Sequence, residues 1–170
     1  MESTYYFEAV TAYDKEAIRH YTTYHYRHVD RRAPLSFLVL GGLFTGLSAW
    51  RLLAGELLLP AVLGIFGLGL LLAGINMLSG KTSVKVPDPV EGRPLTNRHR
   101  FFEDRLEYAG QQTQGYYTYD QITRVGEDRE YFYIYVQSNQ ALVVQKAGMT
   151  LGTPEQLEQF LDRKAPGRRQ

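Results

Sequence analysis

Two long uncharged runs constrain this chain more than any other feature. The first, APLSFLVLGGLFTGLSAW, covers residues 33–50, and the second, LLLPAVLGIFGLGLLLAGINMLSG, covers residues 57–80. A helix that crosses a bilayer needs roughly 17–25 predominantly apolar residues, so the runs predict a transmembrane hairpin over 33–80, with helices at about 33–53 and 57–79. A soluble pair of core helices is disfavoured, because the rest of a 170-residue chain could hardly cover two helices that are apolar all round.

Basic residues flank the two runs on the outside and are scarce between them. The 20 residues before the first run contain five lysines and arginines, and so do the 20 residues after the second. The connecting loop contains only Arg51, which Glu56 offsets. The positive-inside rule therefore predicts a multi-pass protein of the inner or plasma membrane with both termini in the cytoplasm. The 32 mixed-charge residues before the first run disfavour a cleaved signal peptide.

Small residues within the runs have the spacing of helix-packing motifs. Gly42 and Gly46 form a GxxxG pattern, and Gly69 and Ala73 repeat the small-xxx-small spacing. Small residues let two helices approach closely enough for van der Waals contact to hold them together. We expect these residues to pack the two helices of one hairpin, and the alternative is a homo-oligomer that forms through the same face.

The residue types that are missing also restrict the function. No Asp, Glu, Lys, Arg or His lies inside either apolar core. Ion pathways and proton relays normally need such groups in the membrane, so the hairpin is predicted to be an anchor in the lipid bilayer. The net charge of +1 lacks the basic excess of a nucleic-acid-binding protein. The chain has no cysteine, which excludes disulfides, thiolate metal sites and a cysteine nucleophile.

The sequence after the hairpin predicts a linker and then an antiparallel sheet. Residues 81–95 contain three of the seven prolines and are expected to be an extended linker. The next segment is rich in β-branched and aromatic residues separated by turn signals. The predicted strands lie at about 96–102, 105–109, 115–119, 122–127, 131–137 and 140–146. A strand over 3–10, within the N-terminal segment 1–32, can join this sheet because the hairpin returns the chain to the same side.

A helix is expected near the end of the chain. Thr153 and Gln156 form a capping box, and the apolar residues that follow have the i, i+3, i+4 spacing of one helix face. Such a helix would cap the open end of a curled sheet, which gives a cytoplasmic domain over residues 96–165. The last residues, 166–170 (PGRRQ), are expected to be a frayed basic tail.

One predicted strand, YFYIYV, separates two kinds of side chain. Tyr131, Tyr133 and Tyr135 point to one face, and three apolar side chains point to the other. A tyrosine ring is apolar with a polar tip, so this face is expected to be half-buried against another layer, a partner or lipid headgroups. It is the candidate partner face. A base-stacking platform is disfavoured, because no basic-aromatic RNA-binding signature accompanies the strand.

Three of the four histidines lie in HYTTYHYRH, residues 20–28. A helix over about 12–30 places them on one aromatic face ahead of the first membrane span, where aromatic belts are favoured. The residues predicted to lie at the interface are His20, Tyr21, Tyr24, His28, Arg31 and Arg32. A metal pair made by His25 and His28 is an alternative, but no third ligand is evident, so no metal or other cofactor is predicted. Sensing of pH by this face is a further alternative.

Short motifs after the hairpin resemble the YcxB-like family of small bacterial membrane proteins. They are FEDRL at 102–106, YDQI at 119–122 and VQK at 144–146, followed by the final helix. The resemblance extends over nearly the whole chain. It implies a pleckstrin-homology-like sheet, or partial barrel, with a C-terminal helix on the cytoplasmic face of a bacterial inner membrane. It implies no catalytic residue.

Known catalytic patterns such as GxGxxG, GxSxG and HExxH do not occur in the sequence. His99, between Arg98 and Arg100, is expected to be interfacial or solvated. The sequence therefore predicts a membrane-anchored, non-catalytic binding or scaffold module, whose partner is a protein or anionic lipid headgroups. The alternatives are an enzyme of unrecognised type and a self-associating scaffold or pore built on Gly42 and Gly46.

Overall fold

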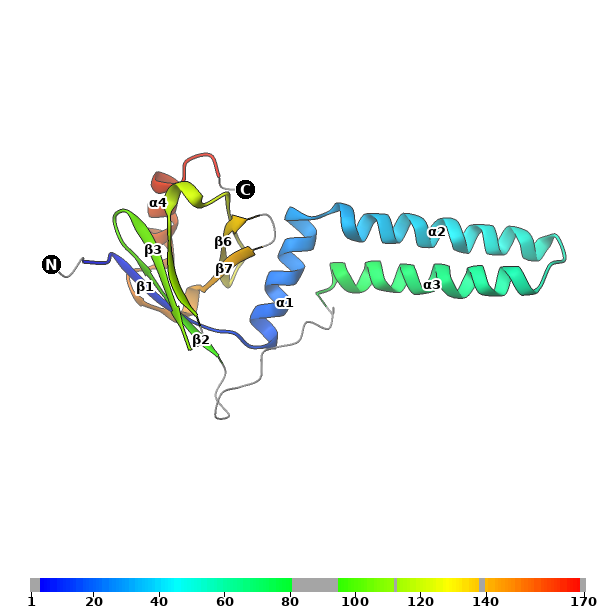
Figure 1. Cartoon of the computed structure of the whole chain (residues 1–170), viewed down its shortest axis with the longest axis horizontal. Coiled ribbons are helices and arrows are strands. Elements are labelled where there is room, and N and C mark those ends of the chain that lie inside the picture. The colour runs from blue at the N-terminus through cyan, green and yellow to red at the C-terminus, as the bar shows by residue number, and fades with distance from the viewer. Residues whose placement is uncertain (1–3, 81–94, 112, 138–139, 169–170) are drawn as a thin grey trace. The chain divides into compact units, whose positions relative to one another are not determined.

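The computed structural model describes residues 4–80, 95–111, 113–137 and 140–168 (Figure 1). The chain divides into two compact units. The sheet unit comprises residues 1–18 and 85–170, and the helical unit comprises residues 19–84. Apart from Leu95, the predicted linker lies outside the described residues.

The helical unit contains two long antiparallel helices, α2 (Arg32–Leu53) and α3 (Leu58–Leu78), as Figure 1 shows. The turn between them includes Gly55, whose φ of 87° lies in the left-handed region that glycine adopts without strain. Both helices are long and apolar enough to cross a membrane, by length and composition. The prediction of two long apolar helices is confirmed, and each predicted end is within one residue of the observed end.

The two helices approach most closely along one stripe of α2. A Cβ atom on Gly41 would lie 2.8 Å from the carbonyl oxygen of Gly67, so neither backbone leaves room for a side chain there. The hydroxyl of Thr45 donates to the carbonyl of Gly41 over 2.8 Å, and that of Ser48 donates to the carbonyl of Pro60 over 2.6 Å. Residues 41, 45 and 48 thus form the packed face of α2.

Gly42, Gly46 and Gly69 lie away from this contact. A Cβ atom on any of the three would meet nothing within 4 Å among the described residues. The prediction that Gly42 and Gly46 pack the hairpin is therefore wrong. The packed face of α2 is displaced by one residue, from positions 42 and 46 to positions 41 and 45. The packed face instead carries two hydroxyls, which need hydrogen-bond acceptors away from water. Ala73 is partly buried.

The sheet unit contains two antiparallel sheets, which confirms the antiparallel region predicted from the sequence. The five-stranded sheet has the order β4-β3-β2-β1-β8. Its strands are β1 (Phe7–Ala12), β2 (Thr96–Phe101), β3 (Arg105–Gly110), β4 (Gln114–Thr118) and β8 (Met149–Leu151). The three-stranded sheet, in the order β5-β6-β7, consists of β5 (Arg124–Glu127), β6 (Tyr131–Gln137) and β7 (Gln140–Gln145).

The N-terminal strand is a structural part of the five-stranded sheet. β1 lies between β2 and β8, and it covers residues 7–12 rather than the predicted 3–10. Phe7, Ala9 and Thr11 are buried, so this face of the strand fixes its register against β2. The short strand β8 was not predicted; within the described part of the chain it pairs with the start of β1.

The core lies between the two sheets and the C-terminal helix, α4 (Pro154–Lys164). The predicted capping box is present: the Thr153 hydroxyl accepts from the Gln156 backbone N–H, and the Gln156 side chain accepts from the Thr153 N–H. Leu157 and Leu161 are buried on the face that packs against the core. The prediction of a C-terminal helix is confirmed.

The described part of the predicted tail, residues 166–168, is anchored rather than frayed, and residues 169 and 170 lie outside the described residues. The carbonyl of Arg168 accepts from the N–H of Val125 on the edge strand β5, over 2.8 Å. The guanidinium of Arg168 donates to the carbonyls of Tyr119 and Asp120, each over 2.8 Å. One arginine thus satisfies backbone groups at an edge that water would otherwise have to solvate.

Candidate functional site

Strand register turns a row of polar side chains to the outer face of the five-stranded sheet, away from the core. Glu8 lies opposite Arg100, Arg100 opposite Glu107, and Glu107 opposite Tyr116. Side chains alternate along each strand, so the neighbour Phe101 points inward and is buried. The outer face therefore carries charged and aromatic groups on a rigid sheet.

Glu8 is the centre of the ion pairs on this face. Its Oε1 accepts from Nε of Arg100 over 2.8 Å, and its Oε2 accepts from the Thr150 hydroxyl over 2.8 Å. The hydrogen bond from Arg100 lowers the pKa of Glu8 below its usual range and, in return, raises the pKa of Arg100. The Arg100 guanidinium also lies 5.0 Å from the centre of the Tyr5 ring. Arg100 is thus held by neighbours on the sheet.

Arg98 has a different environment. In register it stands between Val10 on β1 and Ala109 on β3, neither of which can pair with a cation. Its only ion pair among the described residues is with Glu8, at 3.8 Å, and that carboxylate already accepts from Arg100. The Arg98 side chain is 53% exposed. It is the arginine of this face with the weakest internal pairing.

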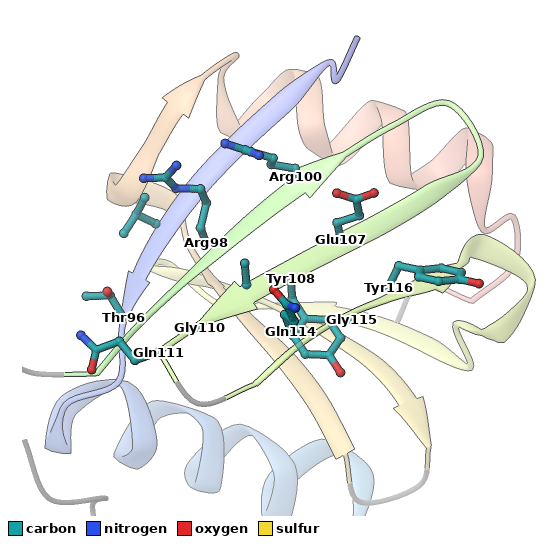
Figure 2. Close-up of a pocket in the computed structure, with 12 residues that line it drawn as sticks. Thr96, Arg98, Arg100, Glu107, Tyr108, Gly110, Gln111, Gln114, Gly115 and Tyr116 are labelled. Atoms are coloured by element: carbon teal, nitrogen blue, oxygen red, sulfur yellow. The ribbon is translucent and has the colours of Figure 1, made fainter. Parts of the chain in front are cut away.

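An open hollow of about 690 Å³ lies beside these arginines on β1 to β4. Figure 2 shows Arg98 and Arg100 on one side of it and Tyr116 on the other. Ala109, Gly110 and Gly115 are part of its lining and contribute little or no side chain, which leaves the space open. The volume is in the range of sites for small organic ligands.

The rest of the lining sets the chemistry of the hollow. Tyr116 is 64% exposed and presents its ring at the edge strand. Glu107 is the one carboxylate among the described lining residues, and its Oε1 accepts from Nε of Arg105 over 2.8 Å. Such a surface can bind an anionic or aromatic group, and among the described lining residues no nucleophile is paired with a base.

His99 lies on the opposite face of β2, inside the domain, which corrects the prediction of an interfacial or solvated position. It is 0% exposed. Neither ring nitrogen makes a hydrogen bond of good geometry among the described residues, although a weaker contact with the Val143 backbone partly opposes the effect of burial on the pKa. Burial lowers the pKa of His99 to about 4, so the ring is neutral at pH 7. Alternation along the strand determines this position, because Arg98 and Arg100 point outward.

The tyrosines of β6 are more deeply buried than the half-buried face that alternation predicted. Tyr131, Tyr133 and Tyr135 are 3%, 0% and 1% exposed. The Tyr133 hydroxyl donates to Oδ2 of Asp128 over 2.6 Å, which gives a buried polar tip its partner. Burial, followed by this hydrogen bond, raises the pKa of Tyr133. These side chains do not line the hollow.

The HYTTYHYRH segment does not form one continuous α-helix. The helix α1 (Lys15–Tyr24) is followed by a π-helical turn over His25–Val29. A π-helical turn is wider than an α-helical turn. The helical wheel that placed all three histidines on one face therefore fails after Tyr24, and the prediction of a single helix over 12–30 is wrong in this respect.

Ring contacts within this segment join histidine to tyrosine. His28 stacks on Tyr24 with ring centres 4.5 Å apart, and Tyr21 and His25 have centres 5.8 Å apart. No third potential ligand joins His25 and His28 in the part of the chain that is described. Metal binding by that pair stays the untested alternative to the prediction of no metal. A prediction also remains for the interfacial role of His20, Tyr21, Tyr24, His28, Arg31 and Arg32.

Sequence reasoning missed the hollow and its residues. In the sequence, Arg98 and Arg100 stand out as basic residues after the hairpin and as the neighbours of His99, not as site residues. The alternation of RHR within a strand could have indicated two cations on one face and a histidine on the other. The pairing of β1 with β2 could not be read from the sequence, because the two strands are separated by the whole hairpin.

Residues 101–162 match the family model described as YcxB-like protein. This segment runs from the last residue of β2 into α4, and it confirms the family resemblance of the motifs. No curated protein and no solved structure matches the chain.

Proposed function

Because residues 101–162 are YcxB-like, we propose that this chain is a membrane-anchored, non-catalytic binding module of that family. In this proposal α2 and α3 hold the protein in the inner or plasma membrane. The sheet unit, a pleckstrin-homology-like domain, binds a ligand on the cytoplasmic side. The observation that carries the proposal is the open hollow beside Arg98, a rigid concave surface with a weakly paired cation.

The surface of the helical unit supports the anchor. Only 17% of the most apolar window of each helix is buried within the protein. Large side chains such as Leu43, Trp50, Ile65 and Leu72 are more than half exposed. A contiguous apolar surface of this kind marks a membrane or protein contact, and here it surrounds two helices of membrane-spanning length.

Charge supports the proposed orientation. At the loop end of the hairpin, Nη1 of Arg51 in the last turn of α2 donates to Oε1 of Glu56 over 2.7 Å, so the positive charge at this end is paired. Basic residues are concentrated before α2 and after α3. The positive-inside rule then puts both termini, and with them β1 and β2 of the same sheet, in the cytoplasm.

The lining of the hollow supports binding rather than catalysis. A general acid or base needs a titratable group that can reach the reacting atom. Glu107 is held by Arg105, and His99 is buried behind the sheet. The arrangement can hold and orient a ligand, as expected for a binding module that is anchored in a membrane.

A ligand that copurifies with the full chain tests the function. The chain is purified from native membranes in mild detergent, and bound molecules are identified by native mass spectrometry. Ala109 is exposed inside the hollow, so Ala109→Trp should fill it and release the ligand. Gln159→Trp, on the exposed face of α4, is the matched control and should retain it. Equal ligand content in both variants would contradict the proposal.

Self-association is a second candidate, because the packing of α2 against α3 leaves the faces of Gly42, Gly46 and Gly69 open. Small residues at this spacing allow close contact between helices of two chains. The combined variant Gly42→Ile, Gly46→Ile should lower the mass measured by light scattering in mild detergent. Leu40→Phe, at an exposed position on another side of α2, should not. An unchanged mass in the combined variant would reject this candidate.

A further inference from the structure

We propose that the hollow takes a small organic oxyanion, a carboxylate or phosphate carried on a flat apolar body, with Arg98 as the residue that binds the anionic group. This inference rests on the proposed function and names the chemical class of its ligand. It follows from the pairing of the charges, the shape of the lining and the position of one exposed aromatic ring.

Arg98 is the cation with capacity for a ligand. Its cross-strand neighbours, Val10 and Ala109, are apolar, so the sheet provides it with no directly opposite acceptor. Glu8 lies at 3.8 Å from Nε of Arg98, beyond hydrogen-bond distance, and is committed to Arg100 and Thr150. A guanidinium presents parallel N–H groups that match the two oxygens of a carboxylate or phosphate.

The balance of charge around the hollow favours a ligand with few negative charges. The charged lining residues are Arg98, Arg100 and Glu107. Glu8 neutralises Arg100, and Arg105 holds Glu107, which leaves the charge of Arg98 the least compensated. A polyanion would bring its further charges close to Glu8 and Glu107, where like charges repel.

The remaining lining fits a flat apolar body. Val10 and Ala109 provide an apolar surface beside Arg98, and the exposed ring of Tyr116 stands across the hollow. Aromatic rings stack face to face with an offset or meet edge to face, and such a contact adds to the burial of apolar area. The volume of about 690 Å³ accommodates a ring together with its charged group.

Titration with defined probes tests the inference. The full chain, labelled with ¹⁵N-arginine, is held in phosphatidylcholine nanodiscs, and the Nε–H signal of Arg98 is assigned by its loss in Arg98→Gln. Phenyl phosphate and benzoate are the anionic probes, and benzyl alcohol is the neutral one. A second preparation contains phosphatidylglycerol, to distinguish an anionic lipid headgroup from a free anion. Affinities are measured by calorimetry.

Phenyl phosphate or benzoate should shift the Arg98 signal saturably. A shift with phosphatidylglycerol alone would mean a headgroup without a flat apolar body and would overturn the inference. Arg98→Gln should weaken the binding of the anionic probe by about tenfold or more, the loss of a bidentate charged contact. Arg163→Gln, an exposed arginine on α4 outside the hollow, should leave it unchanged. The inference is overturned if no anion binds saturably, if benzyl alcohol binds as tightly, or if both arginine variants behave alike.

The same variants separate this inference from the proposed function. If Ala109→Trp releases a copurified ligand and Arg98→Gln does not, the hollow binds a ligand of another chemical class, and only the anion inference fails. If neither substitution changes what is bound, both fail.

Discussion

Oε1 of Glu8 accepts a hydrogen bond from Nε of Arg100 over 2.8 Å, although the two residues are 92 positions apart in the chain. Glu8 precedes the helical hairpin, and Arg100 follows it. Their strands are adjacent in the five-stranded sheet, so the sheet unit is complete only when both ends of the hairpin are on the same side.

Glu8→Gln is expected to lower the free energy of unfolding of the sheet unit by about 1 kcal/mol at pH 7, a modest loss because Arg100 is partly exposed. The lowered pKa of Glu8 means that its charge stabilises the fold above the unfolded value of about 4.5, and that this contribution is lost as pH falls through the lower folded value. Urea unfolding at pH 7 and pH 3, followed by the near-ultraviolet circular dichroism of tyrosine, measures the effect of the substitution at pH 7 and its disappearance at low pH. If Glu8→Gln lowered the free energy of unfolding by the same amount at pH 7 and at pH 3, the stabilising role of the Glu8 charge would be contradicted.

A separate loss of stability, caused by His99, is expected at a higher pH than the loss caused by Glu8. Its folded pKa of about 4 lies below the unfolded value of 6.5. The neutral ring is therefore compatible with the fold above pH 6.5, and about 3 kcal/mol is lost as pH falls from 6.5 to 4, because the unfolded chain binds the proton first. His99→Leu should remove this pH dependence in the same urea experiment.

Thr11→Val is the control for His99, because it changes a neighbouring buried polar group that does not titrate. The Thr11 hydroxyl accepts from the Gln145 N–H over 2.9 Å, so its loss should cost about 1–2 kcal/mol. This cost should be the same at pH 7 and at pH 4.5. If His99→Leu retains the full acid loss, the burial of a neutral His99 is not its cause.

Arg168 should contribute more to stability than an ordinary residue near a chain end. Arg168→Ala removes hydrogen bonds to the carbonyls of Tyr119 and Asp120, and we expect a loss of about 1–3 kcal/mol. Hydrogen exchange at the amide of Val125, which donates to the Arg168 carbonyl, should become faster as the segment detaches. Arg163→Ala on α4 should change neither quantity, and unchanged exchange in Arg168→Ala would show that the segment is held by other contacts.

The hairpin contact can be tested by a disulfide, because the chain has no cysteine of its own. A Cβ atom on Gly64 would lie 3.7 Å from Cβ of Ser48, which suits a disulfide. The pair Ser48→Cys, Gly64→Cys should therefore cross-link in high yield on mild oxidation. Adding Gly67→Leu should reduce the yield, since that side chain would collide with α2, whereas adding Gly69→Leu should not. Equal yields would contradict the observed helix face.

The elements that were predicted well are those whose signal is local. The apolar runs fix α2 and α3, and the capping box at Thr153 fixes the start of α4. Gly41 and Gly42 show the limit: adjacent glycines look equivalent in sequence, and only the hydroxyls of Thr45 and Ser48 and the facing helix select one of them. A local sequence pattern carries no information on the facing helix, and it is the facing helix that determines which face of α2 is packed.

The hollow shows the same limit at longer range. It exists because Val10, Arg98 and Ala109 meet in register across three strands, one of which precedes the hairpin. Each residue is unremarkable in its own segment. The π-helical turn after Tyr24 is likewise invisible to a helical wheel, which assumes one period throughout.

The proposed function depends most on a membrane hairpin that holds the sheet unit in the cytoplasm, and single cysteines measure this topology directly. Ala54→Cys places the only thiol in the loop between α2 and α3, and Gln159→Cys places it on the exposed face of α4. Spheroplasts are treated with a membrane-impermeant maleimide before and after permeabilisation. The account predicts that the Ala54→Cys variant is labelled in intact spheroplasts and the Gln159→Cys variant only after permeabilisation. Labelling of the Gln159→Cys variant in intact spheroplasts, or recovery of the protein in the soluble fraction, would contradict it.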